Sequence, residues 1–261
     1  MAENNSKLDK EEKFFQFLFA DKHFALVRES PIGKSLISLG VPYPDCWIAI
    51  GVKSDFLKDS LPKPIPSDVE WEYKLPGDFD IIAGPMEAGA PADLVVALEV
   101  KRFPFNNGVV KHPSGYGRLQ AKGYLLFGFD RVMLTHIVVA NPLEYQGSNW
   151  IGNAAHVAEG MDALQRKKLD LSDVKCYGYS IGGWSELPGG TPDLSGGFGF
   201  RIVRPPSQNP LCKQEKFIAV RDALFDKIRQ AVNSSNYQAG LGAPLLLDES
   251  LFRDAGKAAD T

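Results

Sequence analysis

PADLVVALEVKRF, residues 91–103, has the composition of a strand that enters a protein core. Its apolar residues include valines, whose branched side chains suit a pleated sheet; they are Leu94, Val95, Val96, Ala97, Leu98 and Val100. Glu99 and Lys101 interrupt this pattern near the end of the strand. Because side chains alternate along a strand, these two charges share one face. A buried charge is costly unless it is paired, metal-bound or solvated, so the strand must supply Glu99 and Lys101 with partners.

The preceding segment contains a further acid. DFDIIAG, residues 78–84, also has the pattern of a strand, and the loop GPMEAGAPAD links the two as in a hairpin. Antiparallel pairing of these strands can bring the carboxylate of Asp80 to that of Glu99. Two carboxylates at one site repel each other unless a divalent cation lies between them, and Mg²⁺ prefers such oxygen ligands. Lys101 opposes this repulsion by favouring the charged forms, but without metal we expect the repulsion to dominate and to raise the pKa of at least one acid.

Asp80 followed by Glu99-Val100-Lys101 resembles the signature of the PD-(D/E)xK nuclease superfamily. This resemblance implies that Asp80, Glu99 and the Val100 carbonyl hold Mg²⁺ or Mn²⁺. It also implies that Lys101 positions and activates a water molecule for phosphodiester hydrolysis. The resemblance covers about residues 70–142 and implies a restriction-endonuclease-like core.

Two further patterns are similar to the RecB-like branch of that superfamily. GDFD, residues 77–80, matches Gly-x-x-Asp, and QAKGY, residues 120–124, matches Gln-x-x-x-Tyr on the next helix. The i, i+4 spacing sets Gln120 and Tyr124 on one helical face. The resemblance implies that Gln120 orients the water, Lys101 or a phosphate. Asp78 competes with Asp80 for the role of first acid, although the Gly-x-x-Asp register favours Asp80.

Many members of the superfamily use another acid, on the first helix, as an extra metal ligand. Glu11, Glu12 and Glu29 are all candidates for that role, and the sequence does not choose among them.

The segment between residues 101 and 131 is basic although the whole chain has a net charge of −3. It contains six basic residues and a single acid, Asp130. A phosphate backbone needs positive charge of this kind beside the carboxylate site. The expected nucleic-acid contacts are Arg102, Lys111, Arg118, Lys122 and Tyr124. Tyr124 could stack on a base, but its alternative role is packing in the core.

Two other motifs lack the context that their chemistry requires. GYSIG, residues 178–182, has the Gly-x-Ser-x-Gly pattern of a hydrolase nucleophile, but a segment rich in Gly and Pro follows Ser180 instead of a helix. SPIGKS, residues 30–35, is similar to the end of a phosphate-binding loop, but Arg28 stands where that loop needs glycine. We expect Ser30 and Pro31 simply to start a helix.

The order of elements predicts one α/β domain with a mixed central sheet flanked by helices. Strands are expected at 46–52, 70–75, 78–84, 93–103, 131–142, 174–184 and 197–205, and helices at 115–128, 153–168 and 213–233. The nuclease-like core spans about 70–142, and elements from 153 to 233 extend it. Amphipathic spacing predicts an N-terminal helix after residue 7, whereas residues 1–7 and 252–261 are expected to be mobile.

The composition fits a soluble globular protein, with 44% hydrophobic and 23% charged residues among 261. The N-terminal residues lack the apolar region of a signal peptide, and no apolar run approaches the roughly 18 residues of a membrane span. Three scattered cysteines predict neither a disulfide scaffold nor a zinc site. We therefore expect a cytoplasmic protein without a membrane partner, and a homo-oligomer or a protein partner stays open.

These observations together predict a Mg²⁺-dependent nuclease, with DNA as the expected substrate. The alternative is a catalytically inactive nuclease-like fold that serves as a nucleic-acid-binding or assembly module. Such a module would tend to lack Asp80, Glu99 or Lys101, and all three are present. The sequence leaves open the strandedness of the substrate, the sequence specificity and the choice between endonuclease and exonuclease.

Overall fold

The computed structural model describes residues 24–63, 65, 69, 71–106, 109–110, 117–140, 150–167, 176–185, 197–234 and 244–252. The strands are β1 (Cys46–Lys53), β2 (Asp78–Glu87), β3 (Ala90–Pro91), β4 (Val96–Asn106), β5 (Val109–Val110), β6 (Arg131–Ala140), β7 (Tyr177–Ser185), β8 (Gly199–Arg204) and β9 (Leu245–Leu247). The helices are α2 (Phe24–Glu29), α3 (Pro31–Leu39), α4 (Asp55–Lys58), α5 (Arg118–Tyr124), α6 (Trp150–Arg166) and α7 (Glu215–Ser234), with short 3₁₀ turns η1 (Leu125–Phe127) and η4 (Glu249–Phe252).

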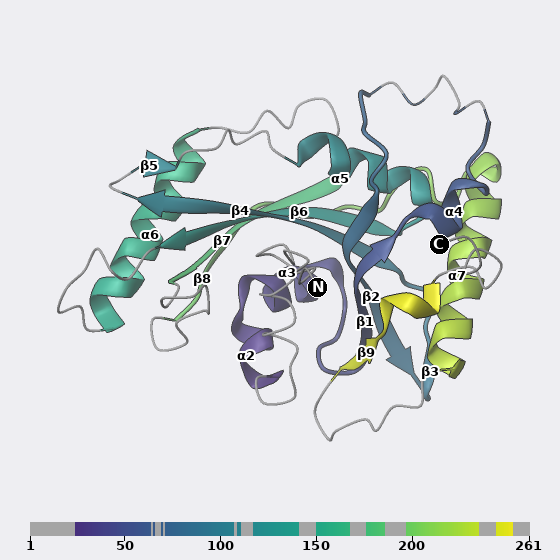
Figure 1. Ribbon diagram of the computed structural model, residues 1–261, viewed down its shortest axis with the longest axis horizontal. Coiled ribbons are helices and arrows are strands. Elements are labelled where there is room, and N and C mark those ends of the chain that lie inside the picture. Colours follow the sequence, from purple (N-terminus) through teal and green to yellow (C-terminus); the bar gives the residue numbers. More distant parts are fainter. Residues whose placement is uncertain are drawn as a thin grey trace, which may run out of the picture.

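A mixed sheet forms the centre of the molecule, with the strand order β8-β7-β6-β4-β2-β1-β9 (Figure 1). β4, β6 and β7 run parallel to one another at its centre. β2 pairs antiparallel with β4, as the predicted hairpin of residues 78–103 requires, and its other edge pairs antiparallel with β1. β3 and β5 add short pairings to β2 and β4. The predicted α/β class with a mixed sheet and flanking helices is confirmed.

Alternation along β4 divides the core into two layers. Val96, Leu98 and Val100 face a cluster that includes residues of α2 and α3. Ala97 and Phe103 face the opposite cluster, which includes residues of α5, η1, α6 and α7. Figure 1 shows α3 and α5 on opposite sides of the sheet. Glu99 and Lys101 have the parity of Ala97 and Phe103 and therefore lie on the α5 face.

The start of α3 confirms the sequence-based interpretation of SPIGKS. Ser30 is the N-cap residue, and its Oγ accepts a hydrogen bond from the backbone N–H of Gly33 at 3.2 Å. Pro31 is the first helical residue, where a missing N–H costs nothing. This segment is therefore a capped helix start.

The prediction of a strand at residues 70–75 is wrong, because residues 72–76 have no regular secondary structure. This segment lies against α5, and the N–H of Lys74 donates to the carbonyl of Leu119 at 2.9 Å. A Cβ at Gly123 would lie only 2.1 Å from the Lys74 carbonyl oxygen. The glycine in the middle of this predicted helix therefore permits close contact with the segment that covers it.

The remaining elements follow the predicted positions closely, with β4 starting at Val96 and β6 ending at Ala140. Residues 1–23, which include most of the predicted N-terminal helix, and residues 253–261 lie outside the described residues, and α2 is the described part of that helix. Phe252, the first residue of the predicted mobile tail, instead ends η4 and is buried, so that boundary is corrected. None of the described helices is long and apolar enough to cross a membrane. The cysteines at 46, 176 and 212 are free thiols.

Candidate active site

The hairpin of β2 and β4 brings the predicted acids together. Ile81 lies opposite Leu98 and Ala83 opposite Val96 in the antiparallel register. Continued by one residue, this register sets Asp80 beside Glu99. The two carboxylates therefore come from adjacent strands, as the sequence predicts.

Lys101 contacts both carboxylates. Its Nζ lies 2.7 Å from Oε1 of Glu99 and 3.5 Å from Oδ2 of Asp80. The side chain of Glu99 is completely buried, and those of Lys101 and Asp80 are only 10% and 17% exposed. One ammonium group is thus shared by two acids in a place that water barely reaches.

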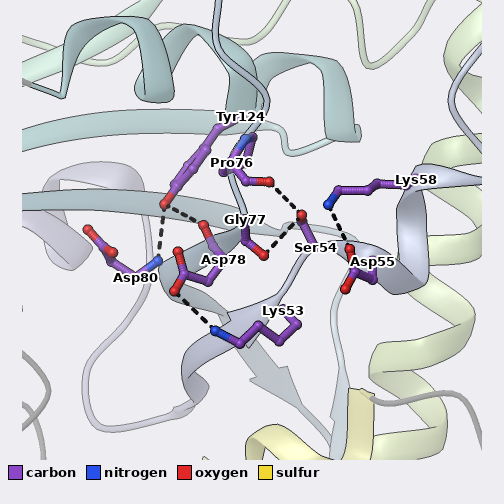
Figure 2. Close-up of polar contacts among 9 residues, drawn as sticks. All are labelled: Lys53, Ser54, Asp55, Lys58, Pro76, Gly77, Asp78, Asp80 and Tyr124. Atoms are coloured by element: carbon purple, nitrogen blue, oxygen red, sulfur yellow. Dashed lines mark hydrogen bonds and ion pairs between the residues drawn. The ribbon is translucent and has the colours of Figure 1, made fainter. Parts of the chain in front are cut away.

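Backbone and tyrosine contacts hold Asp80 in this position. The backbone N–H of Val100 donates to Oδ2 of Asp80 at 2.7 Å. The N–H of Asp80 in turn donates to the hydroxyl of Tyr124 at 3.1 Å, and that hydroxyl donates to the carbonyl of Asp78 at 3.3 Å. Figure 2 shows Tyr124 reaching from α5 to the backbone of β2 between these two acids. Tyr124 therefore ties α5 to the strand that carries the first acid.

Asp78 and Asp80 have different environments, which separates the two candidates for the first acid. The side chain of Asp78 is 47% exposed and pairs with Lys53 at 3.4 Å (Figure 2). Asp80 is the acid that contacts Lys101. The geometry thus favours Asp80, in agreement with the Gly-x-x-Asp register.

Burial dominates the electrostatics of the two acids. It is the largest cause that raises the pKa of Glu99, to about 8, and the negative charge of Asp80 adds to the increase. Burial likewise raises the pKa of Asp80, while Lys101 and the Val100 N–H act to lower it. The expected increase is present, and for Glu99 the repulsion from Asp80 outweighs the Coulombic attraction of Lys101. The loss of hydration, which the sequence analysis did not consider, is larger than either. Burial and both acids raise the pKa of Tyr124, so its hydroxyl stays protonated.

Two carboxylates on adjacent strands are oxygen donors of the kind that suits a hard divalent cation. Within the residues that the structure describes, no three His, Cys, Asp or Glu side chains gather into a metal-binding group. A Mg²⁺ or Mn²⁺ ion held by Asp80 and Glu99 would therefore take its other ligands from water, substrate oxygens and backbone carbonyls. The Val100 carbonyl as one of these ligands stays a prediction.

The other predicted acids contribute nothing to this cluster in the described structure. Glu29 ends α2, which belongs to the opposite face of the sheet, and its 63% exposed side chain pairs with Lys34 at 3.4 Å. Glu11 and Glu12 lie outside the described residues.

Gln120 lies one turn before Tyr124 on α5 and is half-buried. Its position on the helix that contacts the site agrees with the Gln-x-x-x-Tyr pattern. Its role toward water, Lys101 or phosphate stays a prediction.

The predicted nucleic-acid contacts are only partly compatible with the structure. Lys122 and Tyr124 are fully buried, so neither side chain can contact nucleic acid in this conformation, and these two predictions are corrected. The physical reason is that α5 is covered on one side by the sheet and on another by the segment around Lys74. For Tyr124, packing in the core was the stated alternative, and that role is confirmed.

The prediction that Arg102 contacts nucleic acid beside the carboxylates is also corrected. It has the opposite parity to Lys101 on β4, and its guanidinium lies 5.9 Å from the ring centroid of Trp184. Arg118, at the start of α5, is half-buried and remains a candidate contact. Lys111 lies outside the described residues.

Ser180 is excluded as a nucleophile by its position. It lies within β7, is completely buried, and its Oγ is 2.8 Å from Thr135 Oγ1 and 3.2 Å from Ser35 Oγ. A nucleophile elbow needs a sharp turn that exposes the serine, and β7 offers none at this residue.

One residue of the site was missed by the sequence analysis. Gly117 immediately precedes α5 and lies against the side chain of Lys101. Its only signal was its place in the Gly-Tyr-Gly run before the predicted helix, which is too weak to suggest a contact with a residue sixteen positions earlier.

Known proteins supply no relative for this chain: no family model matches it, and no curated protein or solved structure is similar to it. The function must therefore be argued from the chemistry of the site.

Proposed function

We propose that the protein is a metal-dependent nuclease that hydrolyses phosphodiester bonds, with DNA as its substrate and the cytoplasm as its location. The observation that carries this proposal is the buried contact of Lys101 with Asp80 and Glu99 on adjacent strands. These three residues occupy the positions that resemble the PD-(D/E)xK signature.

The energetics of the cluster favour a functional role. Two acids and one ammonium leave a net negative charge in a site with little hydration when both acids are ionised. Such a cluster is weak evidence for stability, because apolar residues of similar size fill a core as well. Titratable groups with strongly shifted pKa values gather preferentially at functional sites. A divalent cation would relieve the excess charge, and this is the partner that the donor set fits.

Each residue has a distinct proposed role in the reaction. Asp80 and Glu99 would hold Mg²⁺ or Mn²⁺, which when bound lowers the pKa of water and offsets charge on the scissile phosphate. Lys101 would orient the attacking water and favour its deprotonated form. Tyr124 would hold α5 against β2 through its hydrogen bonds to the backbone of Asp78 and Asp80, so that Asp80 stays beside Lys101. Gln120 and Arg118 would contact the water or the phosphates from the start of α5.

Cleavage assays with purified protein test this proposal. Supercoiled plasmid, linear duplex, single-stranded DNA and single-stranded RNA are incubated with Mg²⁺, with Mn²⁺ or with EDTA. The proposal predicts metal-dependent cleavage of DNA that Glu99→Gln abolishes. Absence of cleavage in all conditions, with retained binding to an oligonucleotide, would instead support the inactive binding module.

A further inference from the structure

The side chain of Lys101 packs against Gly117, the residue that precedes α5. Gly117 has φ +83°, in the left-handed region that favours glycine. A Cβ at this position would lie 2.9 Å from Cγ of Lys101, 3.5 Å from its Cε and 3.0 Å from Cδ1 of Leu134. The first of these distances is shorter than real side-chain contacts allow. Gly117 is therefore required for the turn and also for the space that the lysine occupies.

Leu134 confines the lysine from another direction. On β6 it is the register partner of Glu99, and it points to the same layer of the core. The aliphatic part of Lys101 therefore lies near Leu134 and the bare backbone of Gly117, with its ammonium group at the two carboxylates. Little free volume is left for another rotamer at this place, since Lys101 is only 8% exposed.

We propose that Gly117 is a positioning residue, whose missing side chain lets Lys101 keep its ammonium between Glu99 and Asp80. A side chain at position 117 displaces the lysine stem and with it the ammonium group. The contact itself is independent of the reaction, and only its catalytic consequence rests on the proposed function. In that case the displaced ammonium no longer orients the attacking water, and a misplacement of about 1 Å can slow catalysis about 100-fold.

Gly89 offers a matched control for backbone strain. It has φ +81°, nearly the same as Gly117, but no atom lies within 4 Å of the place where its Cβ would be. Gly89→Ala therefore introduces a left-handed alanine without a new contact, whereas Gly117→Ala adds the collision with Lys101. A difference between the two variants measures that collision.

The first measurement is the rate at which acetic anhydride labels Lys101 in the folded protein, followed by mass spectrometry of the peptide. We expect labelling several-fold faster in Gly117→Ala than in wild type, because the amine leaves its buried place. Gly89→Ala should label at the wild-type rate. An unchanged rate in folded Gly117→Ala would overturn the proposal.

The second measurement covers the case in which Gly117→Ala is too unstable for labelling of the folded protein. Its melting temperature is compared in the wild-type background and in a Lys101→Ala background, where the lysine stem is absent. We expect Gly117→Ala to lower the melting temperature clearly less in the Lys101→Ala background than in the wild-type background. Gly89→Ala should lower the melting temperature equally in both backgrounds. Equal losses in both backgrounds would show that Gly117 does not act through Lys101.

Cleavage separates this inference from the proposed function. With an active wild type, Gly117→Ala should slow plasmid cleavage about 100-fold more than Gly89→Ala does. An inactive wild type in which Gly117→Ala still accelerates labelling of Lys101 would refute the nuclease and leave the contact established. An active wild type with equal rates in both alanine variants would refute the positioning role and leave the nuclease intact.

Discussion

Two buried polar clusters lie on opposite faces of the central sheet. On the α3 face, the hydroxyls of Ser35, Thr135 and Ser180 form a triangle with sides of 2.8, 2.9 and 3.2 Å. On the α5 face, Glu99 and Lys101 meet Asp80. Thr135 is the β6 partner of Val100, the residue between Glu99 and Lys101, so the two clusters are almost back to back.

The two clusters differ in whether their own members can satisfy every hydrogen bond and balance every charge. Three hydroxyls supply three donors and three acceptors, so the triangle can close its own hydrogen bonds without charge or ligand. The charged cluster cannot reach neutrality with two ionised acids and one ammonium. It must take up a proton or a second cation. Burial, followed by the negative charge of Asp80, raises the pKa of Glu99 and so favours the proton. The difference teaches that buried hydroxyls can satisfy one another without a ligand, whereas buried charge that its neighbours leave unbalanced is the feature on which the proposed site rests.

The largest difference is expected in catalysis. Glu99→Gln removes a proposed metal ligand with almost no change in volume, so metal-dependent cleavage should fall about 100-fold or more. Thr135→Val alters the other face and should leave the rate near that of wild type. Gel assays of supercoiled plasmid with Mg²⁺ measure both rates. Comparable losses in the two variants, with both proteins folded, would remove the functional distinction between the clusters.

The next effect concerns stability without metal. Lys101→Ala leaves two buried acids without their ammonium partner and should lower the free energy of unfolding by about 3–5 kcal/mol. At low pH, protonation of the two acids should recover part of this loss. Urea unfolding in EDTA measures the free energy of unfolding of both proteins. Lys53→Ala is the matched control, because its ion pair with Asp78 is about half exposed and should contribute at most about 1 kcal/mol.

The charged cluster should also make stability depend on pH. Below its ordinary pKa of 4.5, Glu99 is protonated in both the folded and the unfolded protein. Between about 4.5 and 8, the unfolded chain releases this proton while the folded protein keeps it, so the free energy of unfolding falls as pH rises. The decrease should amount to a few kcal/mol and should end above pH 8.

Glu99→Gln isolates this contribution. Melting curves in EDTA from pH 5 to 9 should show a steeper decline for wild type than for the variant, and Ser180→Ala should follow wild type. Since metal binding requires ionised carboxylates, stabilisation by Mg²⁺ should increase over the same range. Parallel curves for wild type and Glu99→Gln would mean that Glu99 titrates normally.

The smallest effect is expected from the neutral cluster. Thr135→Val removes one hydroxyl from the triangle but leaves the contact between Ser35 and Ser180, so the cost should be about 1 kcal/mol. It should be independent of pH and of metal, because no charge is involved. Urea unfolding at pH 6 and pH 9 checks this. A pH-dependent cost would show that the two faces are coupled through β4 and β6.

By itself, the sequence determined the local parts of the candidate site. Alternation along residues 91–103 sets Glu99 and Lys101 on one face, and the short connection to residues 78–84 predicts the hairpin that brings Asp80 to them. Ser30 and Pro31 likewise specify the start of α3 by hydrogen bonding and φ restriction within a few residues. These features depend on neighbours in the chain or on one adjacent strand, so sequence patterns carry them.

Only the tertiary structure decided which of these groups water can reach. The residues around Lys74 have a strand-like pattern, yet they cover α5, and that layer buries Lys122 and Tyr124. The same long-range packing makes desolvation the main cause of the raised pKa of Glu99 and brings Gly117 against Lys101. The physical reason is that hydration and steric fit depend on every element that packs around a side chain, whereas alternation along a strand depends only on the strand itself.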